Sequence, residues 1–77
     1  MRLTKQDLIN KISETNNIII LHNMNTDIKW DYSENNGVYS LIANRINKGT
    51  YKICEGTLKE CFLAINAINL YIQCELD

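Results

Sequence analysis

Residues 28–45 read IKWDYSENNGVYSLIANR, and this stretch decides the fold. Its first half alternates polar residues with three large apolar ones, Ile28, Trp30 and Tyr32, which is the pattern of a strand with one buried and one wet face. Asn36-Gly37 predicts a type I′ hairpin turn, because both central residues of that turn need positive φ. The register that follows pairs Tyr32 with Leu41, Trp30 with Ala43, and Ile28 with Arg45.

Upstream of the hairpin, the sequence predicts a helix over residues 3–14. Thr4 is a good N-cap with Asp7 three residues later, and Leu8, Ile9 and Ile12 form its apolar face. The β-branched run Ile18–Leu21 predicts a short strand buried on both faces. Residues 22–26 are then expected to form a turn-rich link.

Downstream, the third strand is expected over residues 38–46, followed by a turn at Asn47-Lys48-Gly49 and a fourth strand over residues 50–54. Gly56 ends that strand, and Thr57-Leu58-Lys59-Glu60 is a capping box that starts a helix running to about residue 76. The predicted fold is therefore one α+β domain over residues 1–77. It has a helix, a four-stranded antiparallel meander and a long C-terminal helix, with both helices on one face of the sheet.

The last helix is apolar on two sides. At 100° per residue one face carries the residues expected to pack on the sheet: Leu58, Cys61, Ile65, Ile68, Ile72 and Leu76. Almost opposite lies a second stripe, which consists of Leu63, Ala67, Leu70 and Cys74. Two interpretations stay open: the first helix covers part of this stripe, or the stripe binds a partner or a second copy.

Composition narrows the function classes. The chain has 8 Lys and Arg against 9 Asp and Glu, so it lacks the basic surplus that duplex-DNA binders use on phosphates. The three cysteines, Cys54, Cys61 and Cys74, contain no C-x-x-C spacing and are expected to be buried or half-buried free thiols. His22 is the only histidine, and Cys61 and Cys74 are 13 residues apart on one predicted helix, about 20 Å along its axis, so no zinc site is predicted. Nothing local supports a catalytic pair of Cys54 with His22, and no cofactor site is predicted, so we expect a protein that is not an enzyme.

The cellular location is predicted from the hydropathy of the chain and from its amino-acid composition. No apolar run reaches the ~20 residues that span a bilayer, and the N-terminus lacks a signal-peptide core. The 12 Ile and 11 Asn, with no Pro, are typical of a low-GC bacterial or phage gene. We therefore expect the protein to act in the cytoplasm of a bacterial host.

A helix that opens Asp7-Leu8-Ile9-x-x-Ile12, followed by the Asn35-Asn36-Gly37-x-Tyr39 hairpin and a C-terminal helix, resembles the small phage-encoded anti-CRISPR proteins. The likeness is to the Listeria-prophage type that blocks a CRISPR effector nuclease, and it covers about the first 45 residues. That family is strongly acidic, whereas this chain carries a net charge of −1. The resemblance implies a compact inhibitor of a bacterial defence complex, with Asp31 and Glu34 standing in for the family's carboxylates.

Three hypotheses follow. The first is an inhibitor that binds a bacterial protein complex, such as a CRISPR effector, through the last helix's second stripe and a polar lip of the hairpin formed by Asp31, Glu34, Asn35 and Asn36. The second is a structural or regulatory homodimer joined through the C-terminal helix. The third is a nucleic-acid-binding accessory protein that uses Lys29, Arg45, Lys48 and Lys52.

Overall fold

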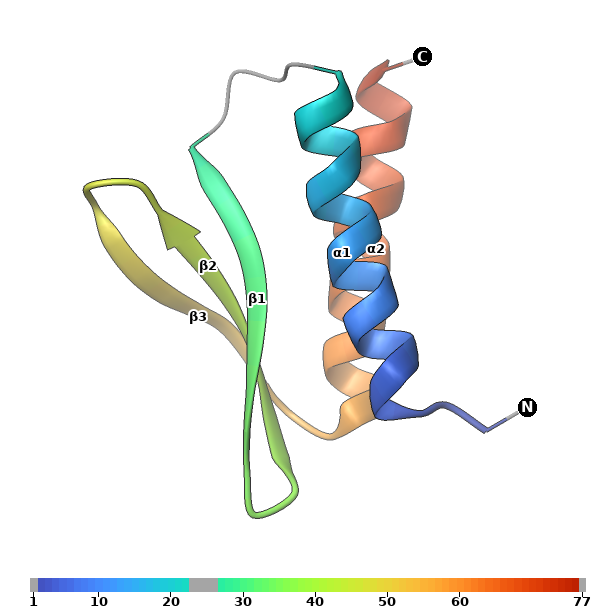
Figure 1. Cartoon of the computed structure of the whole chain (residues 1–77). Coiled ribbons are helices and arrows are strands. Elements are labelled where there is room, and N and C mark those ends of the chain that lie inside the picture. Colours follow the sequence, from blue (N-terminus) through green and yellow to red (C-terminus); the bar gives the residue numbers. More distant parts are fainter. Residues whose placement is uncertain (1, 23–26, 77) are drawn as a thin grey trace.

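The computed structural model describes residues 2–22 and 27–76, with the side chain of Leu76 excluded. The chain forms two layers (Figure 1). One layer is a three-stranded antiparallel meander, in the order β1-β2-β3. The other is a pair of helices, α1 (Lys5–Leu21) and α2 (Leu58–Leu76), which lie side by side on one face of the sheet and run in the same direction. The predicted α+β class and the placement of both helices on one face are confirmed, whereas the prediction of four strands is wrong.

The hairpin has the predicted register. β1 (Ile28–Asn35) pairs with β2 (Val38–Arg45), and Trp30 lies opposite Ala43. Asn36 and Gly37 have φ of 54° and 82°, as a type I′ turn needs. Every pair that the turn chemistry and the alternation of side chains predicted is present.

The last strand is longer than predicted and contains an irregularity. β3 (Gly49–Gly56) extends the predicted strand by one residue at its start and two at its end. Its register with β2 shifts between Leu41 and Ile42. Cys54 lies opposite Leu41 and Lys52 lies opposite Ile42, which leaves Ile53 as the extra residue of a bulge. The strand pattern contained no sign of this extra residue.

The segment Ile18–Leu21, predicted as a strand, is the last turn of α1. The helix buries residues at intervals of four, three and then four along one stripe, namely Leu8, Ile12, Thr15 and the half-buried Ile19. Thr15 is polar and interrupts the apolar pattern, so the sequence shows an apolar helical period only as far as Ile12. Packing of this helical stripe in the assembled domain therefore outweighs the modest strand preference of three consecutive isoleucines. The N-terminal cap is as predicted, since Thr4 and Asp7 form a reciprocal capping box.

The core lies between the two layers. Its fully buried side chains come from α1, β2 and α2, and they are Leu8, Leu41, Cys61 and Ile65, with Ile12 at 6% exposure. Trp30, Tyr32 and Tyr39 pack against this group from the sheet. The predicted inner stripe of α2 thus supplies the centre of the core.

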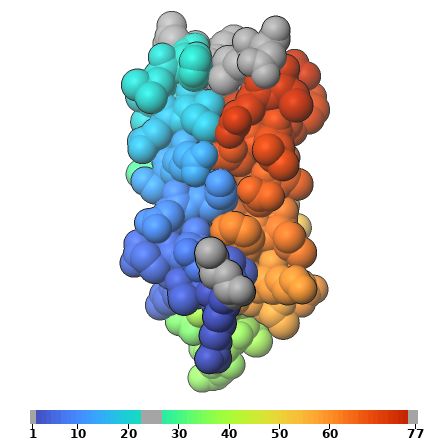
Figure 2. Space-filling model, turned by 90° about the vertical axis from the view of Figure 1, so that its right-hand side faces the viewer, coloured from blue at the N-terminus to red at the C-terminus, as the bar shows by residue number. Residues whose placement is uncertain are grey.

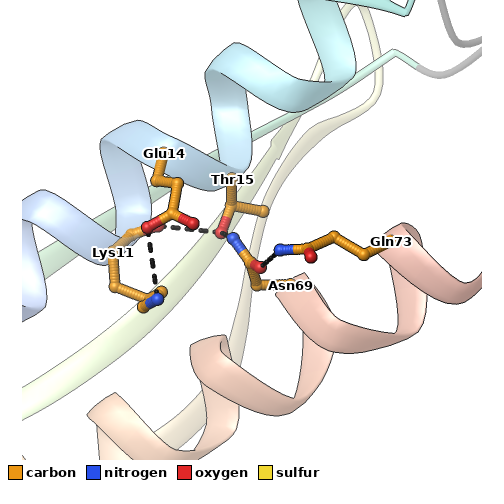
Figure 3. A network of polar contacts seen from close by, with 5 residues as sticks. All are labelled: Lys11, Glu14, Thr15, Asn69 and Gln73. Carbon is orange, nitrogen blue, oxygen red and sulfur yellow. Dashed lines mark hydrogen bonds and ion pairs between the residues drawn. The ribbon is translucent and has the colours of Figure 1, made fainter.

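A buried polar network joins the two helices (Figure 3). The Asn69 side chain, 1% exposed, donates from Nδ2 to Thr15 Oγ1 at 2.9 Å, and Thr15 Oγ1 donates to the Lys11 carbonyl at 2.8 Å. Gln73 donates to Asn69 Oδ1. Each buried polar atom of this network has a partner, so the network fixes how α1 lies along α2 without an unsatisfied group.

The start of α2 makes stability depend on pH. The Thr57 N–H donates to Glu60 Oε1 at 3.0 Å, and this hydrogen bond lowers the pKa of the Glu60 carboxyl. A lowered folded-state pKa means stabilisation that is present above the unfolded pKa and is lost as the pH falls. We expect the free energy of unfolding to decline below about pH 5, and Glu60→Gln to flatten that decline because an uncharged amide oxygen still accepts the hydrogen bond. Urea unfolding of both proteins across this pH range measures the slopes, and identical slopes would contradict the role of Glu60.

Candidate functional site

The outer face of α2 is an exposed apolar surface. Leu63 and Leu70 are each 54% exposed, and Ala67 and Cys74 are also exposed. These four residues, here called the α2 stripe, point away from the sheet because the opposite side of the helix carries the buried Cys61 and Ile65. α1 packs beside α2 and leaves the α2 stripe uncovered, so the interpretation in which α1 covers it is wrong.

The two helices differ on their outer faces. α1 exposes polar residues at the same intervals of four, three and four, namely Gln6, Asn10, Ser13 and Asn17. A surface helix that buries one face normally exposes a polar one, as α1 does up to its last turn, where Ile20 and Leu21 are exposed. α2 departs from this rule within the same molecule, which marks its outer face as a contact surface.

The α2 stripe is also free of charge. Residues 61–74 contain no Asp, Glu, Lys or Arg, and the charged residues next to this stretch are Lys59 and Glu60 at its start and Glu75 at its end. Tyr71, 66% exposed, extends the apolar surface at one flank. A partner for such a surface is expected to be apolar, because a charged one would lose its hydration without gaining an ion pair.

The structure does not bring the four hairpin residues together into one lip. Asp31 and Glu34 are three residues apart on β1, and successive side chains of a strand point to opposite faces. Glu34 lies with Tyr39 on the helix side, where its carboxylate pairs with Lys5 at 3.1 Å. Asp31 lies on the open face and accepts from the Tyr32 N–H at 2.8 Å. A strand period of two was sufficient to predict this separation.

The remaining hairpin residues border a shallow depression on the open face of the sheet. Its lining is mostly polar and comprises Ser33, Asn35, Asn36, Val38, Ser40, Lys52 and Glu55. Lys52 and Glu55 pair with each other, and this pairing lowers the pKa of the Glu55 carboxyl. The depression lies on the opposite side of the molecule from the α2 stripe, so one flat partner surface cannot contact both.

The pair of Lys5 and Glu34 fastens the start of α1 to the hairpin. The Lys5 ammonium also lies 5.9 Å from the centre of the Tyr32 ring. The hydrogen bond to Glu34 raises the pKa of Lys5, and partial burial raises the pKa of Tyr39 beside it. Glu34 therefore has a structural partner. Of the two carboxylates that the resemblance singles out, Asp31 is the one on the open face of the sheet.

Asn16 caps the outer edge of β1. Its side-chain amide donates to the Trp30 carbonyl and accepts from the Trp30 N–H, both at 2.9 Å. This pairing takes the place of a neighbouring strand at Trp30, where the backbone would otherwise be open to strand addition. At the other edge of the sheet, the bulge at Ile53 and the charged Lys52 and Glu55 act against strand addition.

The four basic residues of the nucleic-acid hypothesis do not form one patch. Arg45 pairs with Asp27 at 3.4 Å, and Lys52 pairs with Glu55. Lys29 and Lys52 are on the open face, whereas Arg45 is on the helix side of the sheet. Neighbouring carboxylates thus neutralise two of the four cations that the hypothesis needs.

The cysteines are free thiols in three environments. Cys61 is buried and Cys54 half-buried, with their sulfur atoms 3.6 Å apart, and burial raises the pKa of the Cys61 thiol to about 11. Cys74 is exposed, contrary to the expectation of buried or half-buried thiols, because it lies at the end of the α2 stripe. Within residues 2–22 and 27–76, no three His, Cys, Asp or Glu side chains lie close enough to hold a metal ion.

Two further findings concern the chain as a whole. In the part of the chain that the structure describes, neither helix combines the length and hydrophobicity needed to cross a membrane. No protein-family model, curated protein or solved structure matches this sequence. The resemblance to anti-CRISPR proteins therefore stays a prediction.

Sequence reasoning missed three residues that matter for these surfaces: Asn16, Asn69 and Tyr71. Asn69 falls within about 60° of Ile65 and Ile72 around the helix, so a polar residue on the inner face was a visible signal. Tyr71 follows Ala67 by four residues and was recognisable as a flank of the stripe. Nothing in the sequence pointed to Asn16, since its partner is a backbone 14 residues away.

Proposed function

We propose that this protein is a non-enzymatic inhibitor, encoded by a phage or other mobile element, that works by binding a bacterial protein complex. The observation that carries the proposal is the α2 stripe, an uncharged apolar surface on a helix whose other side already forms the core. Exposed apolar surfaces of this kind in soluble domains are typical of protein contacts.

The surroundings of the stripe support contact through α2 in preference to the sheet. Both sheet edges carry features that act against strand addition, and the open face is mainly polar. The class of target comes from the resemblance alone, which implies a defence complex such as a CRISPR effector. Asp31, Asn35 and Asn36 then form a second, polar surface on the far side of the domain.

The proposal is tested in a bacterium whose CRISPR system prevents plaque formation by a targeted phage. Expression of the chain is expected to restore plaques, and Leu70→Asp is expected to abolish the effect because it places a charge in the middle of the stripe. Ile46→Asp is the matched control, since Ile46 is 67% exposed in the turn after β2 and lies outside the stripe.

Circular dichroism of both purified variants verifies that each one folds. Restored plaques that are equally sensitive to both substitutions would remove the stripe from the proposal. A failure of the wild-type chain to restore plaques in hosts with active CRISPR systems of several types would overturn the inhibitor function.

A further inference from the structure

We infer that the α2 stripe is covered by the α2 stripe of a second copy of this chain, with the two helices antiparallel about a two-fold axis. The inference rests on the proposed function in placing the contact at α2: the two copies cover each other's stripe in the absence of a target, and a target complex replaces the second copy on the same residues. It commits to a symmetric pair, in which each copy buries its own stripe against the other.

The spacing of the stripe is that of a helix–helix seam. Leu63, Ala67, Leu70 and Cys74 follow one another at intervals of four, three and four residues. This is the heptad spacing at which two α-helices interdigitate along a common line. α2 spans 19 residues, or about 28 Å, so the seam covers its central and C-terminal turns.

Residue sizes favour the antiparallel arrangement. With the two-fold axis between positions 67 and 70, Ala67 of each copy faces Leu70 of the other, and Leu63 faces Cys74. Each layer then joins a large side chain with a smaller one, which lets the layers interdigitate at similar spacing. A parallel pair would instead place Leu70 against Leu70 and Ala67 against Ala67, and it would align the two helix dipoles unfavourably.

Charge selects the register. Sliding one copy by a heptad toward the start of α2 would place Glu60 opposite Leu70, which buries a carboxylate without a partner. The register centred between Ala67 and Leu70 keeps the seam within the uncharged residues 61–74. The residues beside the seam are also neutral, namely Asn66, Gln73, Ala64 and Tyr71.

The outer side of the helix layer is large enough for a weak dimer. Figure 2 shows α1, in blue to cyan, and α2, in orange to red, side by side along this face. The exposed Gln6, Asn10, Ser13 and Asn17 of α1 are uncharged, and the charged Lys11 and Glu14 between the helices pair with each other at 3.2 Å.

The area of this face can be compared with that of known stable interfaces. Two helices about 9 Å apart present roughly 28 Å by 20 Å, or about 1,100 Å² for both copies. Specific stable interfaces begin near 1,200 Å², so we expect a weak dimer whose population depends on protein concentration.

Sedimentation velocity from micromolar to millimolar concentration tests self-association. The wild-type chain is expected to shift from its 8.9 kDa mass to twice that mass as concentration rises. Leu70→Asp should remain monomeric across the range, while Ile46→Asp should dimerise like the wild type. A wild-type chain that is monomeric at every concentration overturns the inference, as does a dimer that Leu70→Asp leaves intact.

Cysteine cross-linking tests the direction of the helices. In the antiparallel pair the two Cys74 side chains are about 16 Å apart along the axis, so the wild type should not cross-link rapidly on mild oxidation. Leu63→Cys places a thiol opposite Cys74 of the second copy, and its rapid cross-linking is expected, with peptide mapping locating the bond between positions 63 and 74. Ser33→Cys, on the open face of the sheet, measures the collisional background. Rapid cross-linking of wild-type Cys74 to itself shows a parallel pair and overturns the inference, as does a Leu63→Cys rate equal to that background.

These outcomes are separable from those of the proposed function. A monomeric chain that restores plaques through Leu70 would overturn the dimer and leave the inhibitor intact. A cross-linked antiparallel dimer that never restores plaques would do the reverse.

Discussion

Ile65→Ala is expected to lower the free energy of unfolding by about 2–5 kcal/mol, the range for emptying a fully buried isoleucine site. Ile65 is 0% exposed and lies in the core with Leu8 and Leu41, so surrounding side chains from three elements lose contacts at once. A 77-residue domain has a total stability of about 4–12 kcal/mol at the usual value per residue. The substitution therefore removes a large share of it.

Urea unfolding followed by Trp30 fluorescence measures the loss, because Trp30 is the single tryptophan and packs against the core. Leu63→Ala is the matched control on the same helix, two residues away on the exposed side. In dilute protein, where the chain is monomeric, its effect should stay within about 0.5 kcal/mol. Equal losses for the two variants would contradict the assignment of inner and outer faces of α2.

Asn69→Asp is expected to cost about 3 kcal/mol or more at neutral pH. The substitution replaces an amide that donates to Thr15 Oγ1 with a carboxylate that cannot donate, at a position that is 1% exposed. Lys11, the cation of this network, is already paired with Glu14 (Figure 3). Burial raises the pKa of the new carboxyl above its unfolded value, so the variant should be most stable in acid and lose stability as the pH rises.

Asn69→Leu provides the comparison. It has similar volume and removes the polar group, while the Thr15 hydroxyl still donates to the Lys11 carbonyl and the exposed Gln73 amide turns to water. Its cost should stay within about 1 kcal/mol, because no buried group is left unpaired. Thermal unfolding at acidic and neutral pH separates the two variants, and a loss for Asn69→Asp that does not change with pH would contradict the buried-carboxylate explanation.

The sequence already places the residues of the α2 stripe on one side of the last helix. The helical angles of Leu63, Ala67, Leu70 and Cys74 placed them on one line, and the capping box fixed where α2 begins. The structure added that α1 leaves this line exposed. It also separated Asp31 from Glu34, which divides the predicted hairpin lip between two faces of the sheet.

The sequence by itself determined the elements whose signals are local. Asn36-Gly37 requires positive φ and set the register of β1 and β2, and Thr57 with Glu60 set the start of α2, because each signal acts between residues at most a few positions apart. Only the tertiary structure decided that Ile18–Leu21 continues α1, that Asn69 is buried, and that Asn16 caps β1. In these places the local preference is weak or points the other way. The deciding contacts join residues 14 to 54 positions apart, and they exist only when the two layers are assembled.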